Sequence, residues 1–397
     1  MTRRRNKDLT RPLRVTTMVD SLAAGGAERV AVEVACGLDR SSFDPHVIVT
    51  RGDGPLVELL EDAAVPYTIL GRGDTLELAP WHRAHRLLVE QSDLLHSHKF
   101  GSNAWGALLA RTARVPLIAH EHNFSEHPTR SRKLIDRRWI ASRASRVLCV
   151  SDSVADIERA CGVPDRIIDV VANGVHTEAA WPREAARAEL GLVDSSFTIG
   201  IVGGLRPEKA HEVLLAAMAE LATSGRDVRL CVVGSGPRSE ELQLLAASLG
   251  IAGRVTWAGE RKNAATLAAA FDAGVLCSHW EGMPLAALET MAAGVPLVAT
   301  SVGGLPTLLA DNAGLLVPPA DPAALAAALT RLMDDPTLGR RLARAGARRV
   351  HESYSFEAMV QRIETIYTDV ASTGARSARE SRRIKRAAAR GERQEAA

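Results

Sequence analysis

The sequence has few cysteines, and their placement excludes the common metal-binding and redox motifs. No two of the five form a C-x-x-C pair, and no D-x-D or H-E-x-x-H pattern occurs. We therefore expect no metal and no other cofactor. An odd number of widely spaced cysteines is typical of reduced, buried thiols in a cytoplasmic protein. They stand at positions 36, 149, 161, 231 and 277.

The chain also lacks an excess of charge and a long apolar run. Lys and Arg number 49 against 47 Asp and Glu, so no overall basic surface indicates a nucleic-acid partner. No apolar stretch reaches the length of a transmembrane helix. Arg3, Arg4 and Arg5 are not followed by an apolar segment, so we expect no signal peptide.

Short apolar runs alternate with longer Ala- and Leu-rich stretches over most of the 397 residues. Apolar strands joined through helices are typical of parallel sheets buried on both faces. The alternation restarts after a polar segment at 181–196, which predicts two doubly wound α/β domains with a ligand-binding cleft between them. We place the domains at 13–180 and 196–353 and a helix at 354–370, and we expect disorder at 1–12 and 373–397.

The motif E-G-M-P at 281–284 follows the predicted strand at 274–277, and a second glutamate, Glu289, stands in the next helix. Pro284 suits the first position of that helix, because proline lacks the N–H that would be unpaired there. The free N–H groups after it form an anion site, and carboxylates accept hydrogen bonds from sugar hydroxyls. The pattern fits a nucleotide sugar, although the spacing alone also fits an ordinary surface helix.

A glycine-rich segment, G-G-L-R-P-E-K at 203–209, lies between a predicted strand at 197–202 and a helix that begins near His211. Glycines at a strand end let the backbone approach a ligand closely. Arg206 and Lys209 can then offset the negative charge that builds on a diphosphate leaving group. The alternative is a solvated basic loop.

Two further Gly-Gly pairs precede predicted helices, in G-G-A-E-R at 25–29 and in G-G-L-P at 303–306. Each pair fits the approach of a phosphate to a helix N-terminus, and each also fits a plain tight turn. Neither pair is specific by itself, so both alternatives stay open for the two motifs.

Four histidines stand at the ends of two predicted neighbouring strands: His96 and His98 on one, His120 and His122 on the next. Residues just beyond parallel strands face the cleft, where an imidazole can bind a sugar hydroxyl or transfer a proton. A lone histidine is more often structural. Four at adjacent strand ends favour a polar site, without implying a metal.

Together these motifs resemble the GT4 family of retaining glycosyltransferases, which has the GT-B fold of two Rossmann-like domains facing a central cleft. The resemblance extends from Leu13 to Tyr367, and the order and spacing of the motifs make it specific. The motifs are G-G-A-E-R at 25–29, E-H-N at 121–123, N-G-V at 173–175, P-E-K at 207–209, E-G-M-P at 281–284, Glu289, and G-G-L-P at 303–306.

The resemblance implies transfer of a sugar from a nucleotide sugar, with UDP favoured, to a hydroxyl of a glycan, lipid-linked or small-molecule acceptor. Such enzymes act in polysaccharide, glycolipid or other cell-envelope glycan synthesis. It also implies a C-terminal helix that crosses back to the first domain. Our working hypothesis for the reaction is a front-face displacement in which the leaving phosphate takes the acceptor's proton.

The resemblance also assigns roles to single residues. Glu281 would contact donor-sugar hydroxyls, Glu289 the ribose and Lys209 the diphosphate. In the family, the histidine near the reacting sugar stands six positions after a proline that opens the strand. Counting from Pro116 assigns this role to His122. The other donor-binding positions implied are Gly26 and Gly204 on the phosphate side, Gly259 and Arg261 at the base, and the backbone of Gly282, Met283, Leu285 and Ala286.

One position departs from the family pattern. Gly204 stands where the family usually has arginine, and we expect Arg206, two residues later, to supply the missing charge. Otherwise stabilisation of the leaving group would rest on Lys209 and on helix N-termini. Ala210 replaces a common glycine, and its small size suggests that it is tolerated.

Two other functions remain open: a nucleotide-sugar epimerase on the same fold and a non-catalytic protein that binds sugar nucleotides. A dinucleotide dehydrogenase is disfavoured, because no G-x-G-x-x-G follows the first strand. The segment Arg130 to Arg143 predicts a basic amphipathic helix. Such a helix can contact an anionic membrane at its inner face, or it can be a solvated helix packed on the first domain.

Overall fold

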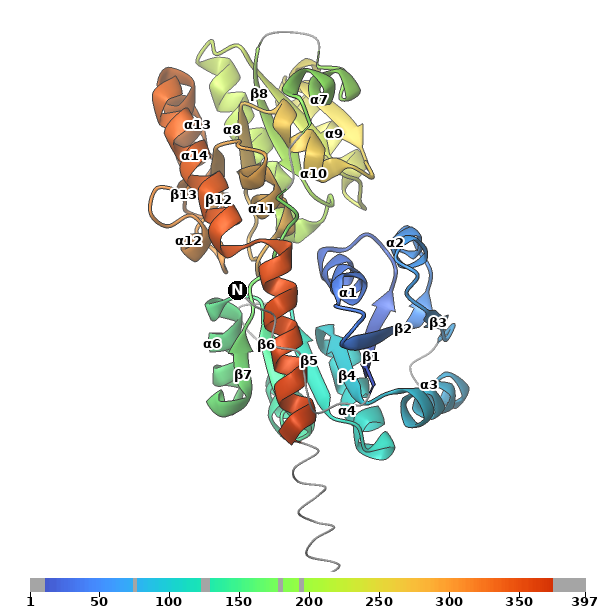
Figure 1. The fold of residues 1–397 in the computed structure, drawn as a ribbon. Coiled ribbons are helices and arrows are strands. Elements are labelled where there is room, and N and C mark those ends of the chain that lie inside the picture. Colours follow the sequence, from blue (N-terminus) through green and yellow to red (C-terminus); the bar gives the residue numbers. More distant parts are fainter. Residues whose placement is uncertain (1–10, 74–76, 123–128, 178–180, 193–195, 374–397) are drawn as a thin grey trace, which may run out of the picture.

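The computed structural model describes residues 11–73, 77–122, 129–177, 181–192 and 196–373. It contains two parallel sheets in two domains, with helices packed around each (Figure 1). The strand orders are β3-β2-β1-β4-β5-β6-β7 and β10-β9-β8-β11-β12-β13. The order of connection reverses between β1 and β4 and between β8 and β11, where doubly wound sheets bind ligands. The predicted α/β architecture is confirmed.

The strands of the first sheet are β1 (Leu13–Ser21), β2 (Phe43–Gly52), β3 (Tyr67–Ile69), β4 (Leu94–His98), β5 (Leu117–Glu121), β6 (Ala144–Cys149) and β7 (Ile168–Val170). Those of the second are β8 (Phe197–Val202), β9 (Val228–Val233), β10 (Val255–Gly259), β11 (Ala273–Leu276), β12 (Leu297–Thr300) and β13 (Leu315–Val317).

The helices of the first domain are α1 (Gly26–Gly37), α2 (Val57–Asp62), α3 (Leu78–Gln91), α4 (Lys99–Ala113), α5 (Arg130–Ile135) and α6 (Asp152–Cys161). The second domain has α7 (Arg183–Glu189), α8 (His211–Thr223), α9 (Ser239–Ser248), α10 (Ala264–Leu267), α11 (Leu285–Ala292), α12 (Leu305–Leu308), α13 (Pro322–Asp334) and α14 (Pro336–Ser353).

Local sequence explains several element ends. The Ser151 hydroxyl accepts a hydrogen bond from the Val154 N–H at the start of α6, and Gly162 ends that helix with φ of +90°. Pro284 differs from its predicted place, because it precedes α11 with ψ of 126°. The helix therefore begins one residue later, and Pro284 fixes the approach of the chain rather than the first turn.

The C-terminal helix, residues 356–373, runs from the second domain back along the first (Figure 1). It begins two residues later than predicted, because Val175 exchanges backbone hydrogen bonds with Tyr354 and Phe356 and keeps that stretch extended. It continues past residue 370 and through residue 373, which we had assigned to a disordered tail. Residues 374–397 lie outside the described part, as do residues 1–10.

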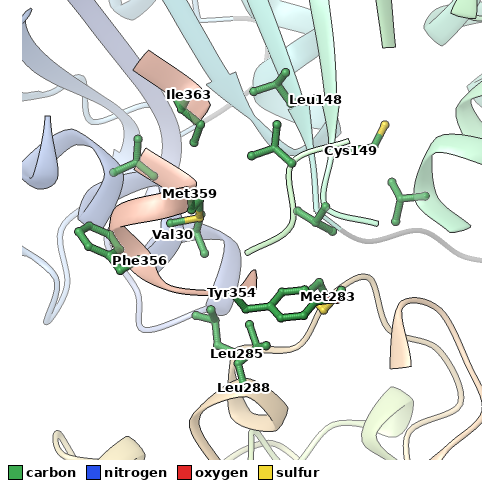
Figure 2. Close-up of a cluster of buried hydrophobic side chains, with 14 of the residues drawn as sticks. Val30, Leu148, Cys149, Met283, Leu285, Leu288, Tyr354, Phe356, Met359 and Ile363 are labelled. Atoms are coloured by element: carbon green, nitrogen blue, oxygen red, sulfur yellow. The ribbon is translucent and has the colours of Figure 1, made fainter. Parts of the chain in front are cut away.

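A single cluster of buried apolar side chains joins this helix to both domains. Phe356 and Met359 from the helix, Val30 from α1, and Met283 and Leu285 from the second domain all belong to it (Figure 2). Burial of this apolar surface stabilises the contact between the domains.

The predicted basic amphipathic helix at Arg130 to Arg143 is divided into two short elements. Helix α5 is followed by a π-helix, Asp136–Ile140, and Arg132 turns inward to Glu121 and Asp136. The segment therefore has one face tied to the domain. Among the described residues, no helix combines the length and the apolar character needed to cross a membrane.

Candidate functional site

Glu281 lies in the loop between β11 and α11, where groups from two separate segments meet. Its side chain is buried, and its Oε1 accepts hydrogen bonds from Lys209 Nζ at 2.6 Å and from Ser278 Oγ at 2.7 Å. Lys209 ends a short 3-10 helix after β8. A carboxylate held in this way has lone pairs left to accept further hydrogen bonds from sugar hydroxyls.

The loop at 281–284 is supported by the G-G-L-P motif. The Gly304 N–H donates to the Gly282 carbonyl at 2.9 Å. A Cβ at Gly303 would collide with the Glu281 carbonyl, and Gly303 itself has a left-handed φ of +56°. Glycine is needed here for a close backbone approach. This pair therefore has a structural role, whether or not it also meets phosphate.

The side chains of Met283 and Leu285, which follow Gly282, are taken up by packing. Met283 and Leu285 are buried in the cluster between the domains (Figure 2). The resemblance assigns the backbone at these positions, rather than their side chains, to the donor. Leu285 and Ala286 begin α11, and the first N–H groups of a helix have no partner within the helix and can bind an anion.

The side chain of Arg206 lies beside Gly204, the position where the family usually has arginine. A Cβ built on Gly204 would lie 3.6 Å from Arg206 Nε, so the arginine approaches the position that lacks a side chain. Ala210, which we expected to be tolerated for its size, has a left-handed φ of +50°. Glycine would adopt this conformation without the strain of roughly 1–2 kcal/mol that a Cβ introduces.

Glu289 on α11 faces the first domain. Its Oε1 accepts a hydrogen bond from Arg29 Nη1 at 2.5 Å, and Arg29 Nε also donates to Glu33 at 2.7 Å. Burial raises the pKa of Glu289, and the charge of Arg29 opposes that rise. The arginine of the G-G-A-E-R motif therefore holds the carboxylate expected to bind ribose.

Three other predicted donor positions lie at strand or helix ends. Gly26 is the exposed first residue of α1, with open space where a Cβ would stand. Gly259 ends β10 with φ of +68°, and Arg261 follows it on the surface. Since β9 and β8 separate β10 from β11 in the sheet, Gly259 and Arg261 stand apart from Glu281, which follows β11.

The four histidines form one buried stack at the ends of β4 and β5. His98 pairs with His120 in the strand register, and ring centroids of neighbouring histidines lie 4.1 to 5.3 Å apart. His96 Nδ1 bonds the Tyr367 hydroxyl at 2.6 Å, and His98 Nδ1 bonds His122 Nε2 at 2.9 Å. Burial lowers the pKa of all four, that of His120 to about 3.

The nitrogens of His96, His98 and His120 lie within 4.8 Å of one another. However, the His96 and His120 rings are stacked with an interplanar angle of 11°, whereas ligands of one metal ion direct their ring edges at a common point. We therefore interpret the group as a stack of neutral imidazoles.

His122 and the N-G-V motif meet the donor loop across the domain boundary. A Cβ at Gly282 would collide with the His122 carbonyl oxygen, so the two backbones are in contact. Asn173 Nδ2 donates to the Met283 carbonyl at 2.7 Å. His122 is therefore next to the loop that carries Glu281. Asn123, the third residue of the E-H-N motif, lies outside the described residues.

Glu121, which stands between His120 and His122 in the sequence, belongs to a group of buried carboxylates. Glu121, Asp136 and Glu158 have carboxylate oxygens within 4.8 Å of one another. Arg132 bonds the first two at 3.1 and 2.7 Å. Burial raises the pKa of Glu121 to about 7 and that of Glu158 to about 9. The bonds of Glu121 to Arg132 and to Asn103 Nδ2, the latter at 2.6 Å, hold the end of β5.

Sequence reasoning missed three contacts of the site: Arg29 with Glu289, Ser278 with Glu281, and Asn173 with Met283. Arg29 and Asn173 lie in motifs that we had singled out, but no pattern in the sequence names a partner 260 or 110 positions away. Ser278 is three residues before Glu281, and its place just after a buried strand was the available signal.

Comparisons with known proteins identify the family of the chain. Residues 182–349 match the family model described as glycosyl transferases group 1, and residues 24–179 match glycosyltransferase family 4. A D-inositol 3-phosphate glycosyltransferase from Thermomonospora curvata is 33% identical, with 88% of this chain and 92% of the relative covered. The protein of the same name from Streptomyces avermitilis is 34% identical over 70% of this chain and 65% of its own length.

Solved structures show the same fold. The crystal structure of HepE from Anabaena in complex with UDP-glucose matches with a TM-score of 0.80 and 24% identity, and covers 90% of this chain and 100% of its own. The two family models together span nearly the whole described chain, and the relatives exceed 30% identity over most of their length. The chain therefore belongs to glycosyltransferase family 4 and has the GT-B fold.

Proposed function

We propose that the protein is a retaining, metal-independent transferase that moves a sugar from a UDP-sugar to a hydroxyl acceptor. The observation that supports this most is the group formed by Lys209, Glu281 and Ser278 at the N-terminal end of α11. It combines a cation, free helix N–H groups and a carboxylate within one loop. Those are the contacts that a diphosphate and an adjoining sugar need.

In this proposal the bond between the sugar C1 and the diphosphate oxygen breaks, and the negative charge passes to the diphosphate. Lys209, Arg206 and the N-terminus of α11 stabilise that charge, which is greatest in the transition state. The acceptor oxygen bonds to C1 on the same face, and its proton goes to the leaving phosphate oxygen. Glu281 orients the sugar hydroxyls, and His122 lies at the sugar. A divalent cation has no required part in these steps.

The UDP preference is supported by the UDP-glucose complex of the Anabaena protein, which shares the fold. Glu289 would accept hydrogen bonds from the two ribose hydroxyls, and Gly259 and Arg261 would meet the base. For the acceptor we propose a hydroxyl of a cell-envelope glycan, a glycolipid or a small polyol. The inositol phosphate named for the relatives belongs in the same test panel.

The test is a thermal-shift panel with UDP, GDP and ADP and their sugars in the presence of a chelator. A ligand that binds only the folded state raises the melting temperature. We expect a shift with the UDP series alone, lost in Glu289→Ala. Transfer from UDP-glucose to the acceptor panel should then give an α-linked product. A free epimerised sugar nucleotide would support an epimerase instead, and binding without turnover a non-catalytic protein.

We also propose that the protein works at the inner face of the membrane. On the segment that follows residue 129, four basic residues and Leu134 are exposed. Basic side chains beside an apolar one favour contact with anionic lipid. The protein should sediment with anionic vesicles at low salt, and Lys133→Glu should reduce the fraction that sediments. Equal sedimentation with neutral vesicles would contradict the proposal. The basic residues are Arg130, Lys133, Arg137 and Arg138.

A further inference from the structure

The contact between His98 and His122 is not explained by packing alone. His98 is fully buried at the end of β4, and His122 is nearly so, just beyond β5. Their facing nitrogens, His98 Nδ1 and His122 Nε2, lie 2.9 Å apart. The other nitrogen of each ring has no hydrogen-bond partner within the described part of the chain. The bond between the two rings is therefore the one ring hydrogen bond that the described structure gives to either histidine.

Two neutral imidazoles at this distance share one proton. If His98 donates, the remaining proton of His122 must stand on Nδ1, and if His122 donates, its Nδ1 is bare. The tautomer of one ring thus fixes that of the other. Burial keeps both rings neutral, because it lowers the pKa of each far below its usual value. The tautomer of His122 is consequently coupled to that of His98, which stands on β4.

The surrounding stack prevents the two rings from turning. His98 lies against His96 at 4.1 Å and against His120 at 5.1 Å, and His122 lies against His120 at 4.2 Å. The far end of the stack is anchored by Tyr367, which belongs to the C-terminal helix. A fixed ring matters at a reacting centre, since small misplacements there cost large factors in rate.

We propose that His98 is a positioning residue that fixes the orientation and the tautomer of His122 at the reacting sugar. This inference rests on the proposed function, in which His122 lies beside the sugar. It extends that function by one residue to which neither the family motifs nor the donor contacts assign a role.

His98 and His96 provide a matched pair for the test. Both are fully buried on β4 and each makes one hydrogen bond through Nδ1, but His96 bonds Tyr367 rather than His122. We compare His98→Leu with His96→Leu, and add His98→Asn, whose amide can replace the Nδ1 bond. For each protein, kcat for transfer, the Kd of UDP and the melting temperature are measured.

We expect His98→Leu to lower kcat about 10-fold or more, with the Kd of UDP unchanged. His98→Asn should recover most of kcat. His96→Leu should lose a similar amount of thermal stability but lower kcat much less, because the bond between His98 and His122 remains. Equal kcat values for the two leucine variants would overturn the proposal, because the effect would then be that of core packing.

A second measurement stands apart from activity. Nitrogen-15 NMR of the histidine rings in the wild-type protein should show one neutral tautomer of His122, and His98→Leu should mix the two. A mixture already present in the wild type would contradict the inference. If the wild type transfers no sugar from any donor, the proposed function fails, while the ring spectrum still decides whether His98 fixes His122.

Discussion

The two domains present opposite chemistry where they meet. The second domain contributes charge: Lys209 and Glu281 form an ion pair at 2.6 Å beside a helix N-terminus. The first domain contributes a stack of buried, neutral imidazoles that ends at His122. Both sets stand at the carboxyl ends of parallel strands, so the shared topology determines where the site lies but leaves its chemistry to the side chains.

This difference follows the demands of the donor. A diphosphate enters with its charge and gains more when it leaves, so its side of the site needs cations and helix N–H groups. The sugar and the acceptor hydroxyl are neutral, and a charged imidazole beside them would disfavour positive charge developing at C1. In the proposed reaction, the neutral imidazole of His122 would lie beside the sugar without that penalty. We call the loop with Lys209 and Glu281 the charged side of the site, and the histidine stack of the first domain the neutral side.

The largest effect is expected from removing the cation of the charged side. Lys209→Met should lower kcat by about 10²–10³-fold, in the range found for loss of one stabilising contact to a transition-state anion. Lys262→Met is the control, because Lys262 also forms an ion pair, with Glu58, but lies exposed at the surface. Steady-state kinetics with UDP-glucose measures both. Similar rates for the two variants would refute the role given to Lys209.

The next effect concerns the stability of the neutral side. His120 is fully buried without a hydrogen bond to its ring in the described structure, and burial lowers its pKa to about 3. The unfolded chain binds a proton near pH 6.5 that the folded one refuses, so this histidine's contribution to stability is lost as the pH falls below that value. The loss is on the order of 1.4 kcal/mol per pH unit.

His120→Leu should therefore make the free energy of unfolding fall less steeply from pH 7 to pH 5 than in the wild type, measured by urea denaturation. The buried carboxylates Glu121 and Glu158, whose pKa values are raised, act in the opposite sense in both proteins and cancel from the difference. Replacement of the exposed His351 by Leu serves as the control. If the free energy of unfolding of His120→Leu depended on pH as steeply as that of the wild type, His120 would not be held neutral in the folded protein.

The smallest effect tests the link between the two sides. Without Arg29, the pKa of the buried Glu289 should rise further, because the opposing charge is gone. UDP-glucose should then bind Arg29→Met several-fold more weakly at pH 6 than at pH 8, a change that calorimetry can detect. The wild type and Arg29→Lys should show little difference between the two pH values. No pH dependence in Arg29→Met would exclude a need for ionised Glu289.

Much of the fold and most of the site positions follow from the sequence, because buried parallel strands are short apolar runs and the motifs follow their ends. The strand Phe197–Val202 was predicted residue for residue. What the sequence does not contain is the pairing of distant side chains, such as Arg29 with Glu289. Nor does it show that His96 bonds Tyr367, since that contact depends on where the C-terminal helix docks.

Errors in the predictions also have local causes. Pro284 was placed inside its helix because proline is common at the first position, yet the tertiary contacts of the 281–284 loop hold it extended. The basic segment from Arg130 to Arg143 was predicted as one surface helix. Its pattern of charges could not reveal that Arg132 is drawn inward by two buried carboxylates.

The most direct test of the account is amide hydrogen exchange with and without UDP. If the second domain holds the donor, UDP should slow exchange at 203–211 and 281–289, and Glu289→Ala should abolish the change. The strands of the first domain, away from His122, should be unaffected. Protection confined to the first domain, or protection that persists in Glu289→Ala, would contradict the assignment of the donor site to the charged side.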